Sequence, residues 1–177
     1  MLNRSDGGLA NLIIHELTHA TLFIKDNVNF NENLASFIGE KGAFRFLEYK
    51  YGKDSKPYQY YMQSMSDEKL FNQYILGGAK RLDSLYENFN SSMSVNLKDS
   101  LKNNLIKQIF VGADSLPLFN KEKYQKTYKK NVLPNNAYFI SYLIYDSKRE
   151  DLEKEFQTKF NSDIKKYLSS LKKKYSS

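Results

Sequence analysis

The sequence predicts a mainly α-helical protein. Apolar residues recur three and four positions apart along most of the chain, which is the spacing of one helix face. No segment has the pattern of a β-hairpin, and no internal repeat is present. A chain of 177 residues can build one core of useful size, so we expect a single helical domain over residues 1–177.

Two helices are expected in the first third of the chain. The apolar residues that predict the first helix, over residues 10–24, are Leu9, Leu12, Ile13, Leu17 and Leu22. The polar stretch KDNVNF then breaks the pattern, and Asn29 or Asn31 is expected to cap a second helix. Gly52 and Pro57 end that segment, so residues 9–52 are expected to form a helix pair.

Residues 66–177 are expected to form further helices. One begins at Ser66 and carries the Gly77-Gly78 pair, which indicates a kink or a close contact. Another covers residues 95–110 and is followed by a looser stretch with the run KEKYQKTYKKN. Pro134 is then expected in the first turn of a helix, and two shorter amphipathic segments follow it.

Composition and charge exclude several classes of protein. Cysteine is absent, so a metal site must use nitrogen and oxygen ligands. No long uncharged apolar run is present, so no transmembrane helix is expected. The net charge of +7 is thinly spread, with its densest run at the C-terminus, whereas a nucleic-acid-binding protein more often carries one basic stripe. We therefore expect no nucleic-acid partner.

The motif HELTH carries the clearest chemical signal. His15 and His19 are four residues apart, so on a helix they lie one turn apart on nearly the same face and can reach one metal ion. Glu16 lies beside them, where it can take a proton from a water molecule that zinc has acidified. The attack expected from such a site is on a polarised carbonyl, most naturally that of a peptide bond.

The motif has to be weighed against a chance match, because HExxH patterns are common. The chain holds only two histidines, and both belong to this motif. The motif also lies inside the apolar segment LANLIIHELTHATLFI, where histidines and a glutamate need a reason to be present. Both observations favour zinc binding.

Catalytic zinc takes three protein ligands, so a third ligand is needed. With no cysteine or further histidine it must be a carboxylate. The nearby candidates are Asp26, Glu32 and Glu40. Asp26 is expected in the turn and pointing away, whereas Glu32 and Glu40 both lie on the second helix. The spacing alone does not choose between these two.

The segment NENLASFIG, residues 31–39, resembles the glutamate helix of thermolysin-like gluzincins. The resemblance implies that Glu32 is the third zinc ligand. Those enzymes have an aspartate that orients a zinc-binding histidine, and Ser36 stands at the corresponding position here. The hydrogen bonding that orients the histidines is therefore expected to differ.

More of the chain, from Leu9 to Leu171, is similar to the bacterial predicted-aminopeptidase family of zinc metallopeptidases. The segments that carry this similarity are HELTH, FNENLASFIGEKGA, KRLDSLYENF, LPNNAYFISYLIY and EKEF. The resemblance implies a zincin-like helical bundle that corresponds to the C-terminal half of a gluzincin. Fourteen residues precede His15, too few for the N-terminal sheet of those enzymes. We therefore expect a fragment, or a piece that works with another chain.

Other candidate residues lie near the C-terminus. Asn135 and Asn136 follow Pro134 and either cap a helix or bind the backbone or terminus of a substrate. A zincin often needs a phenol or imidazole to stabilise its oxyanion, and no histidine remains for this. The candidate tyrosines are Tyr138, Tyr142 and Tyr145, of which Tyr145 fits the family-like segment best, with packing in the core as the alternative.

The leading hypothesis is a zinc-dependent peptidase, of the aminopeptidase type by resemblance, with Zn²⁺ as cofactor and a peptide as substrate. The alternative is a non-catalytic helical module that zinc stabilises. Self-association through an exposed apolar face is a further expectation. The compartment stays open: the cell envelope or periplasm if an exported N-terminal part precedes this chain, and otherwise the cytoplasm.

Overall fold

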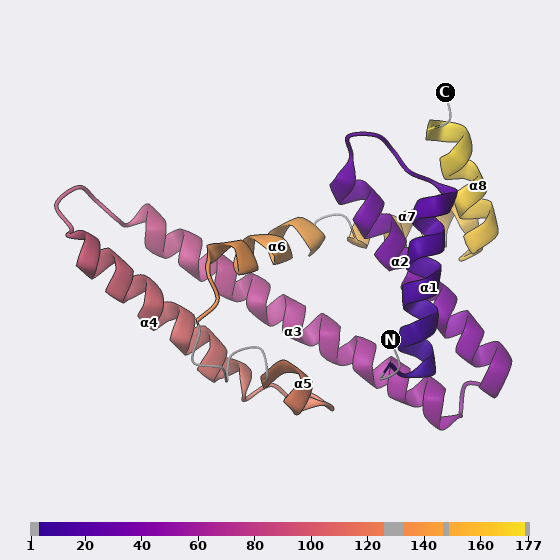
Figure 1. Cartoon of the computed structure of the whole chain (residues 1–177), viewed down its shortest axis with the longest axis horizontal. Helices are drawn as coiled ribbons and strands as arrows, with labels where there is room; N and C mark the ends of the chain where they lie inside the picture. The colour runs from indigo at the N-terminus through magenta and orange to yellow at the C-terminus, as the bar shows by residue number, and fades with distance from the viewer. Residues whose placement is uncertain (1–3, 126–132, 147–148, 176–177) are drawn as a thin grey trace. The chain divides into compact units, whose positions relative to one another are not determined.

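The computed structural model describes residues 4–125, 133–146 and 149–175, with the side chains of residues 143–146 excepted. Helices account for nearly all of these residues, and no strand occurs among them (Figure 1). The mainly α-helical prediction is therefore confirmed. The helices are α1 (Asp6–Thr21), α2 (Val28–Tyr51), α3 (Lys56–Glu87), α4 (Val95–Ala113), α5 (Lys121–Gln125), α6 (Asn136–Asp146), α7 (Arg149–Phe160) and α8 (Ile164–Tyr175). Within the described ranges, none of them is long and apolar enough to cross a membrane.

The chain divides into two compact units. Unit 1 comprises residues 1–62 and 144–177, and unit 2 comprises residues 63–143. The division falls within α3, which contributes its first turns to unit 1 and the rest to unit 2. The C-terminal helices α7 and α8 thus belong with α1 and α2, whereas the sequence pattern grouped them with the remainder of the chain.

In unit 1, α1 and α2 pack closely because α2 carries glycines at the contact. A Cβ atom added to Gly39 would lie 2.5 Å from Asn11 Oδ1 and 2.9 Å from the backbone oxygen of Asn11. A Cβ atom added to Gly42 would lie 2.6 Å from Cδ1 of Ile14. Side chains at these positions would push the helices apart. The two glycines therefore let the backbone of α1 approach α2 directly.

The first helix differs from its predicted bounds at both ends. It begins at Asp6 rather than residue 10, because the Ser5 side chain accepts a hydrogen bond from the backbone N–H of Gly8 and caps it. It ends at Thr21 rather than residue 24, since Leu22 is extended and buried in the core. Gly7 lies in the first turn of α1, where the absence of a side chain lets Tyr61 pack against the helix backbone, since a Cβ atom there would lie 2.6 Å from the Tyr61 ring.

The turn between α1 and α2 is held by one buried asparagine. Asn31 accepts a hydrogen bond from the backbone N–H of Ile24 at 2.9 Å and donates one to the carbonyl oxygen of Ile24 at 2.8 Å. The predicted cap at Asn29 or Asn31 was wrong: Asn27 caps α2, its side chain accepting from the N–H of Phe30. Asn31 fastens the preceding turn instead.

The core of unit 1 joins the helix pair to the C-terminal helices. Its buried apolar residues are Leu22, Leu34, Phe37, Ile38, Leu152, Phe156, Tyr167 and Leu171. Polar contacts border it: Glu40 pairs with Arg149, and Lys41 pairs with Glu153 at 2.7 Å. Both pairs join α2 to α7, so they add polar links to the apolar contact between these two helices.

In unit 2, α4 runs along the unit-2 part of α3 (Figure 1). Gly78 makes this close approach possible, since a Cβ atom there would lie 2.8 Å from Ile109. Of the kink or close contact expected at the glycine pair, the close contact is therefore confirmed.

Helix α3 begins at Lys56, ten positions before the predicted Ser66. The reason is that Ser55 accepts from the N–H of Tyr58 and Pro57 occupies the first turn, where proline is tolerated.

Candidate metal centre

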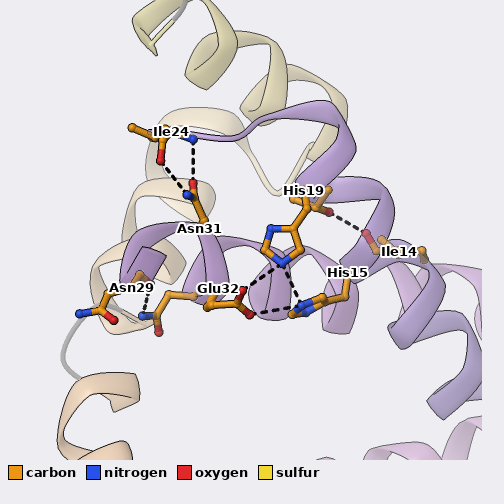
Figure 2. Close-up of polar contacts among 9 residues, drawn as sticks. Ile14, His15, His19, Ile24, Asn29, Asn31 and Glu32 are labelled. Atoms are coloured by element: carbon orange, nitrogen blue, oxygen red, sulfur yellow. Dashed lines mark hydrogen bonds and ion pairs between the residues drawn. The ribbon is translucent and has the colours of Figure 1, made fainter. Parts of the chain in front are cut away.

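Three side chains of unit 1 bring their ligand atoms together. Figure 2 shows His15 and His19 of α1 and Glu32 of α2 pointing toward one another. The Nε2 atoms of the two imidazoles are 3.1 Å apart. His15 Nε2 lies 3.5 Å from one carboxylate oxygen of Glu32, and His19 Nε2 lies 3.4 Å from the other. Among the residues that the structure describes, this is the one group of three such side chains placed to hold a metal ion.

These separations fit a small tetrahedral ion. Ligands at about 2.0–2.1 Å from a tetrahedral zinc are about 3.3–3.4 Å from each other. The two Nε2 atoms are 3.1 Å apart, and each lies near this value from one of the two Glu32 oxygens, at 3.5 Å for His15 and 3.4 Å for His19. Two imidazole nitrogens and one carboxylate also form a ligand set that catalytic zinc uses. The residues present therefore fit the ion that the sequence pattern predicts.

Local helix geometry and the packing of α1 on α2 together position the three side chains. The two imidazole rings meet edge to face, with centroids 4.8 Å apart, as expected for neighbours one turn apart on a helix. Gly39 lies opposite this part of α1, since a Cβ atom there would be 3.4 Å from Cβ of His15. Asn31, the residue before Glu32, holds the turn between α1 and α2 through its two hydrogen bonds to Ile24. The position of Glu32 against the histidines therefore depends on the helix contact at Gly39 and on the turn before α2, and not on the HELTH motif alone.

The candidate site is partly open to solvent. The side chains of His15 and His19 are 19% and 21% exposed, and that of Glu32 is 39% exposed. The second ring nitrogen of His19, Nδ1, is buried and has no hydrogen-bond partner among the described residues. Ligating histidines usually donate this N–H to a carboxylate or carbonyl oxygen. Among the described residues, none gives His19 this support.

The other predicted acids differ in their surroundings. Glu16 is exposed on α1, next to His15 in sequence. Asp26 is exposed in the turn with a positive φ of 60°, outside the cluster. Glu40 is only 14% exposed and pairs with Arg149 of α7. Of the three carboxylates weighed as third ligand, the structure brings only Glu32 to the histidines.

The predicted residues near the C-terminus belong mainly to unit 2. Asn135 caps α6 by accepting from the backbone N–H of Tyr138 at 3.3 Å, which agrees with the capping interpretation. Asn136 accepts from the hydroxyl of Tyr86 at 2.8 Å. Both therefore have a structural role, which leaves their role in binding substrate a prediction.

The candidate tyrosines have different outcomes. The hydroxyls of Tyr138 and Tyr142 are hydrogen-bonded to each other at 3.1 Å. Burial raises the pKa of both, most strongly for Tyr138, where the hydrogen bond to Tyr142 adds to the effect. Both pack in unit 2, against the apolar core around Phe110 and Phe139. Tyr145 lies in α6, and its side chain is outside the described part of the chain.

Sequence reasoning missed the residues that assemble the site rather than those that would bind metal. Asn31 was expected to be a helix cap, and Gly39 was not singled out. The pair Gly39 and Gly42, three residues apart in GEKG, was the available signal for a close helix contact. No local signal pointed to Arg149, because its partner Glu40 is 109 residues away in sequence.

The chain as a whole matches a known protein family. Residues 1–176 match the family model described as "Putative aminopeptidase", and the chain belongs to this family. No curated protein and no solved structure gives a significant match. The expected membership in an aminopeptidase family is thus confirmed.

Proposed function

We propose that this chain is a zinc-dependent peptidase of the aminopeptidase type. In this proposal His15, His19 and Glu32 hold the zinc ion, and Glu16 is the general base. The observation that supports it best is the convergence of one ligand atom from each of the three side chains within 4.8 Å of one another. Membership in the aminopeptidase family supports the same reaction class. An HExxH helix followed by a helix with the third glutamate is the ligand order of gluzincins.

The residues of the chain divide the chemistry between them. A zinc ion held by His15, His19 and Glu32 would supply an acidified water molecule and would polarise the carbonyl of the scissile peptide bond. The Glu16 carboxylate accepts a proton from the attacking water and passes it to the nitrogen of the leaving amine. The two neutral imidazoles and the single carboxylate of Glu32 leave a net positive charge at the centre. That charge favours the oxyanion that forms during attack.

Tyr145 is the residue that we propose as the hydrogen-bond donor to this oxyanion. Tyr138 and Tyr142 are poorer candidates because their hydroxyls already bond to each other in unit 2. Loss of one oxyanion donor lowers kcat by about 100-fold or more in other hydrolases. We expect Tyr145→Phe to lower kcat by about that factor and to leave zinc content unchanged.

Metal analysis of matched variants tests the proposal. We expect one zinc per chain in the parent protein and in Glu40→Gln, and none in Glu32→Gln, because Glu40 is paired with Arg149 away from the site. Full zinc content in Glu32→Gln would contradict the ligand assignment. The two substitutions remove the same charge from the same helix, so each controls for the other.

Hydrolysis of peptides with a free and an acetylated N-terminus tests the reaction. We expect Glu16→Gln to keep its zinc and to lose activity by at least about 100-fold, because general-base catalysis contributes this much. Faster hydrolysis of the free than of the acetylated peptide is expected of an aminopeptidase. Zinc binding by a parent protein without peptidase activity would support the alternative, a helical module that zinc stabilises.

A further inference from the structure

Unit 2 carries a surface hollow that the metal centre does not explain. Its volume is about 430 Å³, and it lies between α4 and the start of α6. This volume is within the range of sites that bind small molecules or short peptides. All of its lining residues belong to unit 2 and to the described part of the chain.

The polar side chains around the hollow offer hydrogen-bond donors. The Asn135 side-chain oxygen accepts from the N–H of Tyr138, and the Asn136 side-chain oxygen accepts from the hydroxyl of Tyr86. A carboxamide carries one oxygen acceptor and one NH₂ donor group. Both oxygens are engaged by other groups of the protein, so among the described residues the two exposed Nδ2 groups are left to donate to a ligand.

Lys102 adds a positive charge to the same hollow. Its ammonium group contacts Asp99 at 3.1 Å, and its side chain is 32% exposed. An ammonium has three N–H donors, so two remain after the contact with Asp99. The lining itself contains no aspartate or glutamate. Because Asp99 compensates the charge of Lys102, the N–H donors are what the hollow offers, and they suit a ligand that presents acceptor oxygens.

The rest of the lining is apolar. It consists of Ile106, which is buried, together with Leu133, Pro134 and Ala137. A small inorganic anion would gain nothing from this surface, whereas an apolar side chain next to a carboxylate would be covered by it. The combination is the one presented by the last residue of a peptide chain.

We propose that this hollow binds the C-terminal carboxylate of a peptide whose last side chain is apolar. The carboxylate is held by Lys102 and by the Nδ2 groups of Asn135 and Asn136, and the side chain rests on Ile106 and Leu133. The two asparagines thereby acquire a role in peptide binding in addition to their structural hydrogen bonds. This binding is independent of metal and of catalysis at the metal centre.

Calorimetric titration of the full chain tests the proposal, with a chelator present so that no metal contributes. The probe is N-acetyl-Ala-Ala-Leu as the free acid, compared with its C-terminal amide and with inorganic phosphate. We expect the acid to bind at least about tenfold more tightly than the amide, because charge-assisted hydrogen bonds are lost in the amide. The proposal would be overturned if the acid did not bind, or if the acid and the amide bound equally well. It would also be overturned if inorganic phosphate bound more tightly than the acid.

Two pairs of variants place the binding at the hollow. Lys102→Gln and Lys107→Gln remove the same charge from α4, but only Lys102 lines the hollow. Asn103→Asp and Asn104→Asp add the same charge at neighbouring exposed positions, but only Asn103 lines the hollow. We expect about tenfold weaker binding of the acid in Lys102→Gln and Asn103→Asp, and unchanged binding in the two controls.

Equal effects in both members of each pair would also overturn the proposal. Three of the four positions are exposed and Lys102 is half-buried, so all four variants are expected to fold, which a helical circular-dichroism spectrum like that of the parent verifies. Binding of the acid by the zinc-free chain does not require peptidase activity. The two proposals can therefore fail independently of each other.

Discussion

Two pairs of side chains in this protein have the same spacing and opposite outcomes. His15 and His19 in unit 1, and Tyr138 and Tyr142 in unit 2, are each four residues apart on a helix, and each pair has its polar atoms 3.1 Å apart. A carboxylate from a second helix, Glu32, joins the histidines. The tyrosines are surrounded by apolar residues and satisfy each other.

The comparison shows that local spacing brings polar atoms together without deciding what they do. Helix geometry alone produces both pairs. A third group with the right charge makes a candidate metal centre of the first pair. Partial burial against the core makes a structural contact of the second, since a hydroxyl that is shielded from water needs a partner.

Zinc is expected to stabilise the protein through the histidine pair only. At a free zinc concentration of about 100 times the Kd, the free energy of unfolding should rise by about 2.7 kcal/mol. His19→Gln should lose this gain, and Tyr142→Phe should keep it. Urea unfolding with zinc and with a chelator measures both. An equal gain in His19→Gln would contradict the assignment of the site.

Gly39→Ala is expected to separate α1 from α2 and weaken the site. The added Cβ atom meets a backbone oxygen at 2.9 Å, so the free energy of unfolding should fall by about 1–3 kcal/mol and zinc affinity should fall with it. Gly77→Ala is the control, because a Cβ atom there meets nothing within 4 Å. It should instead add roughly 0.5–1 kcal/mol of stability, because alanine favours a helix. Similar losses in both variants would rule out close packing as the cause.

The tyrosine pair is expected to make the protein sensitive to alkali. Burial raises the pKa of Tyr138 and Tyr142 in the folded state, so the folded protein keeps protons that the unfolded chain releases above about pH 10. Stability should therefore be complete below that pH and fall as the pH rises further. Tyr138→Phe should reduce the slope by at most about 1.4 kcal/mol per pH unit. Unfolding measured from pH 8 to 11 would show it, and an unchanged slope would speak against the buried pair.

Tyr124→Phe is expected to have a small stabilising effect. The Tyr124 hydroxyl is buried and has no hydrogen-bond partner among the described residues, and its ring packs on Phe71. Removing a buried hydroxyl without a partner relieves its desolvation penalty, so stability should rise by up to about 1 kcal/mol. Tyr138→Phe, which breaks a hydrogen bond, should lower stability at neutral pH by a similar amount. A loss in Tyr124→Phe would mean that the hydroxyl has a partner.

Local sequence signals predicted several features well. The HELTH spacing predicted two imidazoles on one helix face, because neighbours four residues apart are fixed by helix geometry alone. Gly52 ends α2 as expected, and Asn135 caps the helix that was expected there. The Gly77-Gly78 pair predicted a close contact, which Gly78 makes with Ile109.

The errors arose where a residue acts at a distance. Asn31 resembles a helix cap in sequence, but its side chain bonds to Ile24, seven residues earlier. Pro57 resembles a break, but the serine before it starts a helix. An asparagine can cap a helix or fasten a turn, and a proline can end a helix or lie in its first turn. The surrounding backbone determines which of the two roles each residue takes.

Composition and helix periodicity are local properties, so the helical class and the histidine pair could be predicted from the sequence, and any further metal ligand was restricted to a carboxylate. The packing of α1 on α2 then brings Glu32 rather than Glu40 to the histidines. Both glutamates lie on α2, and the rotation of α2 against α1 is set by Gly39, Gly42 and the turn that Asn31 holds. This rotation turns Glu32 toward the imidazoles, while Glu40 pairs with Arg149 from the far end of the chain.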